Sequence, residues 1–169
     1  MAKVLTGSFK IEAIGNLEND PALGVSAFNF DHINNYIIAN GTAAGQSNMV
    51  WVSNRTLAAS TSEILALTGS LTDQYGATIT FTRINGIIIS ANSANTNLVQ
   101  VGGASTNTFI NWVSGATSVI QVRPGGVFSM YSNDATGYAV TASTGDKLQI
   151  ANSGVGTSVN YDIILIGCV

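Results

Sequence analysis

The sequence predicts an all-β protein, a two-sheet antiparallel β-sandwich. Three observations lead to this expectation: segments with apolar residues at every second position, Gly-rich turns between them, and no helical segment of normal length. Strand signals that recur about every eight to twelve residues are typical of a sandwich or barrel. The 169 residues suit a single domain with its own core.

The N-terminal region predicts one strand followed by an arm. Within residues 4–14, Phe9, Ile11 and Ala13 alternate with polar neighbours, which is the pattern of a half-buried strand. From Gly15 to Asn35 the chain is rich in Gly, Asn, Asp and Pro without sustained periodicity, so we expect a long loop or an extended arm. Loops of this length inside a compact domain are often functional.

Short strands are expected to resume at Tyr36–Ala39 and Met49–Val52, with a turn between them. Residues 60–63 resemble a helix-capping box, but the alternative of two strands, 56–59 and 63–68, is favoured because the segment is short and rich in Thr and Ser.

The strongest β signal covers residues 77–91. The Asn85-Gly86 pair within it predicts either the turn of a hairpin or a bulge in one continuous strand, and the sequence leaves both open.

The C-terminal half predicts a regular series of strands separated by Gly-rich turns. The expected strands are 98–101, 109–113, 119–123, 127–131, 138–141, 147–151 and 159–168. A total of about eight or more strands suits a two-sheet jelly roll. We therefore expect one domain, with N-terminal strands and an extended arm in residues 1–52 and a jelly-roll-like core in residues 53–169.

The composition argues against nucleic-acid and membrane partners. Charged residues make up only 9% of the chain, and the six basic residues are scattered rather than gathered in a stripe that could neutralise phosphates. No polybasic or amphipathic segment suits a membrane surface, and no signal peptide is evident, so synthesis in the cytoplasm is expected. A chain with so little charge is more soluble when partners cover its surface.

The search for catalytic chemistry leads to a prediction of no enzyme, no cofactor and no metal. The only histidine, His32, follows Asp31, and adjacent side chains of an extended chain point apart. One histidine and the single Cys168 cannot supply a zinc site, and Cys168 is expected to end the last strand as a small apolar residue. Trp51 and Trp112 lie in apolar segments and are expected in the core.

The second half of the chain resembles a family of small virion proteins of tailed bacteriophages. The resemblance covers roughly residues 55–169. The segments that carry it are Leu71-Thr72-Asp73, Gly76 to Thr82, Val101 to Ala104, Val122 to Val127, Asp134 to Thr141, Leu148 to Gly154 and Tyr161 to Ile164.

This resemblance implies a jelly-roll capsid decoration or cement protein on the virion surface, commonly a homotrimer. Such a protein would stabilise the phage head by binding the major capsid protein at capsomer junctions. Its expected contact segment is the arm, with Phe28 and Phe30 as anchors in the protein's own core or in a neighbour and His32 as a further contact. The alternative is a trimeric receptor- or carbohydrate-binding tip or fibre protein of the virion.

Overall fold

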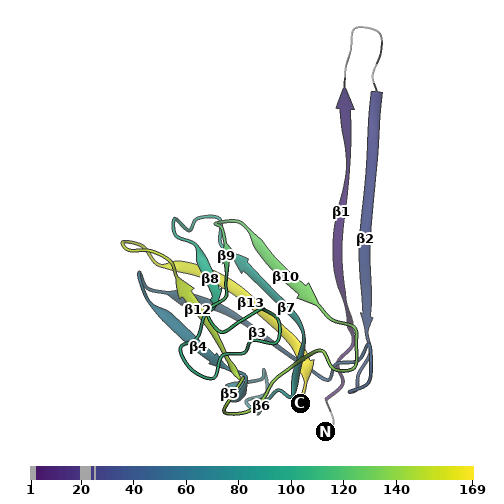
Figure 1. Ribbon diagram of the computed structural model, residues 1–169. Coiled ribbons are helices and arrows are strands. Elements are labelled where there is room, and N and C mark those ends of the chain that lie inside the picture. The colour runs from purple at the N-terminus through teal and green to yellow at the C-terminus, as the bar shows by residue number, and fades with distance from the viewer. Residues whose placement is uncertain (1–2, 20–23, 25) are drawn as a thin grey trace.

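The computed structural model describes residues 3–19, 24 and 26–169 and confirms the all-β prediction (Figure 1). No helix occurs in these residues, and every ladder between the named strands is antiparallel. Two larger sheets form the body of the molecule, and a long hairpin stands away from it.

The first sheet has the order β10-β7-β13-β3, and a short strand, β11, also pairs with β7. Its strands are β3 (Met49–Leu57), β7 (Arg83–Ala91), β10 (Val127–Tyr131), β11 (Tyr138–Ala139) and β13 (Val159–Cys168). The central pair, β7 and β13, consists largely of Ile, Leu and Val, which suits strands with neighbours on both sides.

The second sheet has the order β4-β12-β8-β9, and a separate small ladder joins β5 to β6. The strands of the second sheet are β4 (Ser62–Ala66), β8 (Val99–Gly102), β9 (Val119–Val122) and β12 (Lys147–Asn152). The small ladder consists of β5 (Thr68–Thr72) and β6 (Thr78–Thr80).

Residues from both larger sheets belong to one buried apolar cluster. Ile89 and Ile163 of the first sheet and Val101 and Ile150 of the second are each fully buried within it. Burial of one such side chain stabilises the fold by roughly 1.5–3 kcal/mol. Trp51 is buried in the same cluster and Trp112 packs against it, as expected for both.

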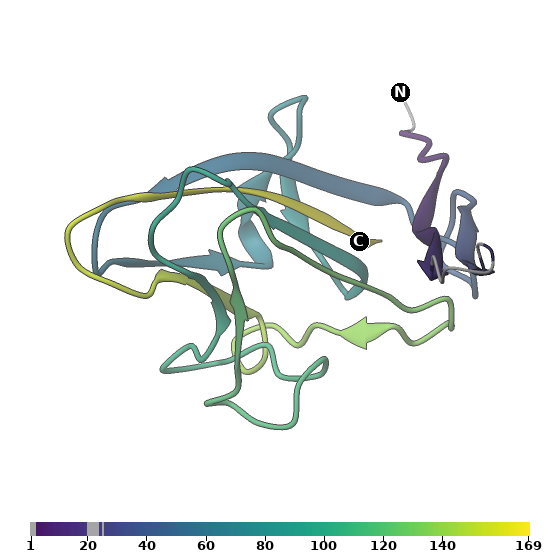
Figure 2. The ribbon, with the colours of Figure 1, turned by 90° about the horizontal axis from the view of Figure 1, so that it is seen from above.

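The N-terminal region forms the hairpin, from β1 (Gly7–Asn19) and β2 (Ser26–Ile38). Thirteen consecutive residue pairs join the two strands without a register shift. The two strands pair with each other and with no other described strand, and Figures 1 and 2 show them beside the two sheets rather than within them.

Of the two forms expected for residues 15–35, the long loop is wrong for residues 15–19 and 26–35, which instead form an extended arm of two paired strands. Backbone pairing across the hairpin overrides the weak strand preference of the Asn and Gly residues in this segment. The remaining residues of the predicted loop, 20–23 and 25, lie outside the described part, and Gly24 is in no strand.

At Asn85-Gly86 the chain forms a continuous strand with a bulge, and the hairpin alternative is excluded. On β13, Ile166 faces Gly86 and Gly167 faces Ile84, so Asn85 has no opposite partner. Its side chain is buried and makes four hydrogen bonds, with Ser132, Ser47, Arg83 and Cys168. These bonds offset the cost of an interrupted ladder.

The strand alternative for residues 56–68 holds and the helix alternative is excluded, but the bounds differ. Thr56 and Leu57 end β3, residues 58–59 lie in no strand, and residues 63–66 and 68 belong to β4 and β5. The strands 127–131 and 159–168 have the predicted bounds. The predicted strand 109–113 is wrong. Phe109 is buried in the core, and the Trp112 indole donates a hydrogen bond of 2.9 Å to the Phe109 carbonyl, which closes a turn. The expected division between residues 52 and 53 falls inside β3.

Candidate functional site

The hairpin has one face without charge and one charged face. Residues directly opposite each other in an antiparallel pair lie on the same face. The uncharged face, here called the apolar face, carries Ile11, Ala13, Gly15 and Leu17 of β1 and Phe28, Phe30, His32 and Asn34 of β2. All four charged residues of the two strands lie on the other face, here called the charged face: Lys10, Glu12, Glu18 and Asp31.

The root of the apolar face is packed against the outer side of the first sheet. Phe9, Ile38 and Ile166 form a buried cluster there. The ring of Tyr131 on β10 stacks on Phe9 at 4.9 Å between ring centroids and on Tyr36 at 5.1 Å. These aromatic contacts fix the hairpin to the body and set the direction in which it projects.

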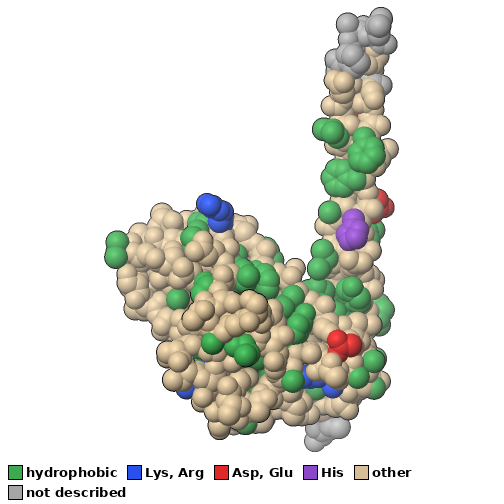
Figure 3. All heavy atoms as spheres, in the orientation of Figure 1, with side chains coloured by type: hydrophobic (Ala, Val, Ile, Leu, Met, Phe, Trp, Pro, Cys, Tyr) green, Lys and Arg blue, Asp and Glu red, His purple; other side chains and the backbone are tan. Residues whose placement is uncertain are grey.

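Beyond the root, the same face is open to solvent. Leu17 and Phe28, directly opposite each other, are 70% and 67% exposed, and Phe30 is 45% exposed. Figure 3 shows green apolar side chains along the projecting hairpin, separated from the body by open space. An exposed apolar stripe on a polar protein is typical of an interaction surface.

The three residues predicted from the sequence as partner contacts lie on this one face. Phe28 and Phe30 are exposed and do not reach the protein's own core. Of the two sites expected to hold them, the protein's own core and a neighbouring subunit, the core is therefore excluded. His32 is exposed, and its Nε2 atom lies 3.0 Å from Nδ2 of Asn34 on the same face. Asp31 lies on the opposite face, as expected for adjacent residues of a strand.

Sequence reasoning missed Leu17 and Ile11, the residues of β1 that complete the apolar face. The signal was present: the alternation recognised at Phe9, Ile11 and Ala13 continues to Leu17 through Gly15. Gly15 interrupts the apolar pattern because it leaves room for Phe30. A Cβ atom there would lie 2.7 Å from Cζ of the Phe30 ring, so the ring rests across the glycine.

A cavity of about 590 Å³ lies at the base of the body, between the N-terminal segment, the start of β3 and the turn after β5. Its lining is mainly apolar, with Leu5, Met49 and Val50. Its charged side chains are Lys3 and Asp73, which form an ion pair. The Lys3 ammonium lowers the pKa of the Asp73 carboxyl.

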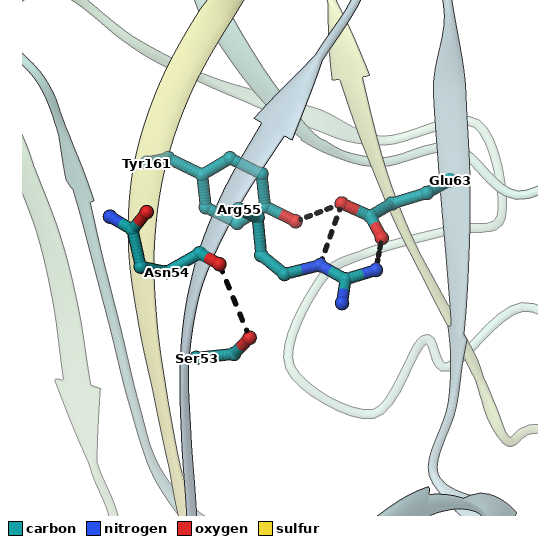
Figure 4. A network of polar contacts seen from close by, with 5 residues as sticks. All are labelled: Ser53, Asn54, Arg55, Glu63 and Tyr161. Carbon is teal, nitrogen blue, oxygen red and sulfur yellow. Dashed lines mark hydrogen bonds and ion pairs between the residues drawn. The ribbon is translucent and has the colours of Figure 1, made fainter.

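A second polar group lies between the two larger sheets and has a structural role (Figure 4). The Tyr161 hydroxyl donates a hydrogen bond of 2.7 Å to Oε1 of Glu63, and Arg55 forms an ion pair with the same carboxylate. Burial alone would raise the pKa of Glu63, but the hydrogen bonds from Arg55 and Tyr161 outweigh burial and lower it. Burial and the bond to Glu63 raise the pKa of Tyr161. The group ties strands of different sheets together.

The Asn133-Asp134 turn is capped by its own side chains. The Asp134 carboxylate accepts hydrogen bonds from the hydroxyls of Thr136 and Ser132 and from the backbone amides of Gly137 and Thr136, and all of these lower its pKa. In the described residues, no three His, Cys, Asp or Glu side chains lie close enough to hold a metal ion. No helix in the same residues could cross a membrane.

The comparisons with known proteins give no relative from which to infer a function. No protein-family model, no curated protein and no solved structure matches the chain.

Proposed function

We propose that this chain is a non-enzymatic structural protein of a virion, a decoration or cement subunit that binds the major capsid protein of a phage head at capsomer junctions. The resemblance of residues 55–169 to small proteins of tailed phages suggests this assignment. The observation that carries it is the hairpin, a thirteen-pair ribbon that projects from the body with an apolar face open to solvent.

The strand orders support a jelly-roll sandwich as the body of this subunit. Consecutive strands are divided between the two sheets five times: β3 and β4, β7 and β8, β9 and β10, β11 and β12, β12 and β13. This alternation is the pattern of two Greek keys wound into a jelly roll. Such a body, held by one shared core, is a rigid support for a projecting arm.

The arm supplies the contact with neighbouring subunits. A two-stranded ribbon without further cover is only marginally stable in water, so burial on assembly would order it and would remove its apolar side chains from water. Weak contacts of this kind add up over the many copies in a shell. The protein is made in the host cytoplasm and reaches its working position on the capsid surface.

The test is the position and copy number of the protein in purified particles. Copies in proportion to the capsomer junctions support the proposal. A handful of copies at the tail would contradict it and favour the receptor-binding alternative. A variant in which a two-residue turn replaces residues 12–33 keeps Phe9, Tyr36 and Ile38 at the root. We expect it to fold and to be lost from particles, and unchanged occupancy would show that the arm is not the anchor.

A further inference from the structure

We propose that the apolar face of the hairpin is an interface with a second copy of this chain, formed in solution before any particle is bound. This inference rests on the proposed function only in treating the hairpin as an assembly element. It makes a second copy of the chain the first of the neighbouring subunits that the arm contacts.

The first argument is the distribution of charge. In a two-fold self-interface, residue i of one copy contacts residue j of the other, and residues near the axis meet their own copies, so the surface must be uncharged or self-complementary. The charged residues of the strands all project from the opposite face, where Lys10 and Glu12 also pair with each other. The apolar face therefore meets its own copy without placing like charges side by side, which would cost several kcal/mol per pair.

The second argument is the shape of the face. Phe30 lies flat across Gly15, because that position has no side chain to hold the ring away. Leu17 and Phe28 form the next rung toward the tip, and Ala13 and His32 form the rung below. The small residues on β1 beside the rings on β2 leave a broad surface on which a second ribbon can pack.

The apolar face of the hairpin is also free to bind a partner in every isolated copy of the chain. The root of the apolar face is buried against the body, so the buried surface continues directly into the open stripe. The stripe is open in every free copy, and two strands alone do not stabilise a ribbon of this length. A second copy of the chain is the one partner that is always present with it.

The test is the mass of the purified protein in solution, measured by sedimentation velocity over a range of concentrations. We expect a mass above that of one 17.4 kDa chain. The double variant Phe28→Ser/Phe30→Ser removes two central aromatic contacts, so it should weaken association about tenfold or more. The matched control Ile14→Ser/Ile33→Ser changes two residues on the charged face that are 56% and 46% exposed, and it should associate like wild type.

A second measurement separates loss of contact from loss of folding. In a Cys168→Ala background, Ala13→Cys places a thiol on the apolar face and Glu12→Cys places one on the charged face. A bulky maleimide attached at position 13 should prevent association, whereas the same reagent attached at position 12 should not. A monomeric wild type, equal dissociation of both serine variants, or an equal effect of the reagent at both positions would overturn the inference.

These experiments distinguish a failure of the self-interface from a failure of the proposed function. Self-association of the wild type together with its absence from particles would remove the capsid assignment and leave this interface standing. If Phe28→Ser/Phe30→Ser is lost from particles but associates like wild type in solution, the apolar face binds the capsid protein, and the inference is wrong.

Discussion

The Tyr161 hydroxyl donates a hydrogen bond of 2.7 Å to the Glu63 carboxylate and so joins β13 of one sheet to β4 of the other. Arg55 on β3 donates to the same carboxylate through Nε at 3.3 Å and through Nη2. Only 16% of the Glu63 side chain is exposed, so the carboxylate depends on these donors for its solvation.

We predict that Glu63→Gln lowers the free energy of unfolding by about 1–3 kcal/mol near neutral pH, because it removes the charged acceptor of three hydrogen bonds. The folded-state pKa of Glu63 is lowered, so its contribution is complete above the ordinary value of 4.5 and is lost as the pH falls through the folded value. The difference between wild type and variant in urea unfolding should therefore shrink below pH 4.5. A difference that is constant with pH would contradict this account.

The control for this variant is Asp162→Asn on the same strand as Tyr161. Asp162 lies on the outer, exposed side of the sheet and accepts a hydrogen bond from Asn54. Its replacement should change stability by no more than about 0.5 kcal/mol, as is usual for a surface substitution.

Replacement of Asn85 should destabilise the fold through the bulge in β7. Asn85→Ala leaves Ser47 and Ser132 without their hydrogen-bond partner in a buried region, at a cost of about 2–3 kcal/mol. Thermal unfolding should show a clear fall in Tm. The exposed Asn54→Ala is the control and should have a smaller effect. Equal effects of the two variants would show that the bulge does not depend on the Asn85 side chain.

Tyr131→Phe should be neutral or should raise stability by about 1 kcal/mol. The Tyr131 hydroxyl is buried and has no hydrogen-bond partner in the described residues, and such a group costs free energy in the folded state. Burial also raises its pKa. The phenylalanine ring keeps the stacking on Phe9 and Tyr36. A loss of stability on chemical unfolding would indicate that the hydroxyl has a partner.

Cys168 should react with a thiol reagent only when the fold opens. Its side chain is 1% exposed at the end of β13, beside the carbonyl groups of Gly41 and Gln46. The rate of modification in the native protein should be orders of magnitude below that of an exposed thiol, and it should rise with denaturant. Val155→Cys, at a site that is 82% exposed, supplies the fast reference within the same chain. Fast native labelling of Cys168 would contradict the buried position.

The sequence was informative where a local pattern decides the structure. The turns around β10 and the alternation in β13 are local signals, and both strands have their predicted bounds. It was ambiguous at Asn85, because the groups that settle the bulge, Ser47 and Ser132, are 38 and 47 residues away in the chain. The apolar run that begins at Phe109 wrongly predicts a strand. In the structure, Phe109 is buried in the core and the residues that follow it form a turn.

The residues that the candidate site takes from β2 were predictable, but those from β1 and the arrangement of both were not. Phe28 and Phe30 were recognised as apolar residues in a polar segment. Their arrangement on one face with Leu17 depends on pairing between strands that are separated by the hairpin turn, and composition gives no evidence of such pairing. The pairing register of β1 and β2 in the structure places Leu17, Phe28 and Phe30 together on one exposed face.

The position of β13 between β7 and β3 has a consequence for folding during synthesis. Residues 159–168 form the middle of the first sheet, so a nascent chain that has reached only residue 150 holds β3 and β7 without the strand that joins them. Closure of that sheet must wait for contacts between residues seventy or more positions apart, which is slow. Until then the apolar edges of both strands are open to other chains, so aggregation during expression should be greatest for products truncated before residue 159.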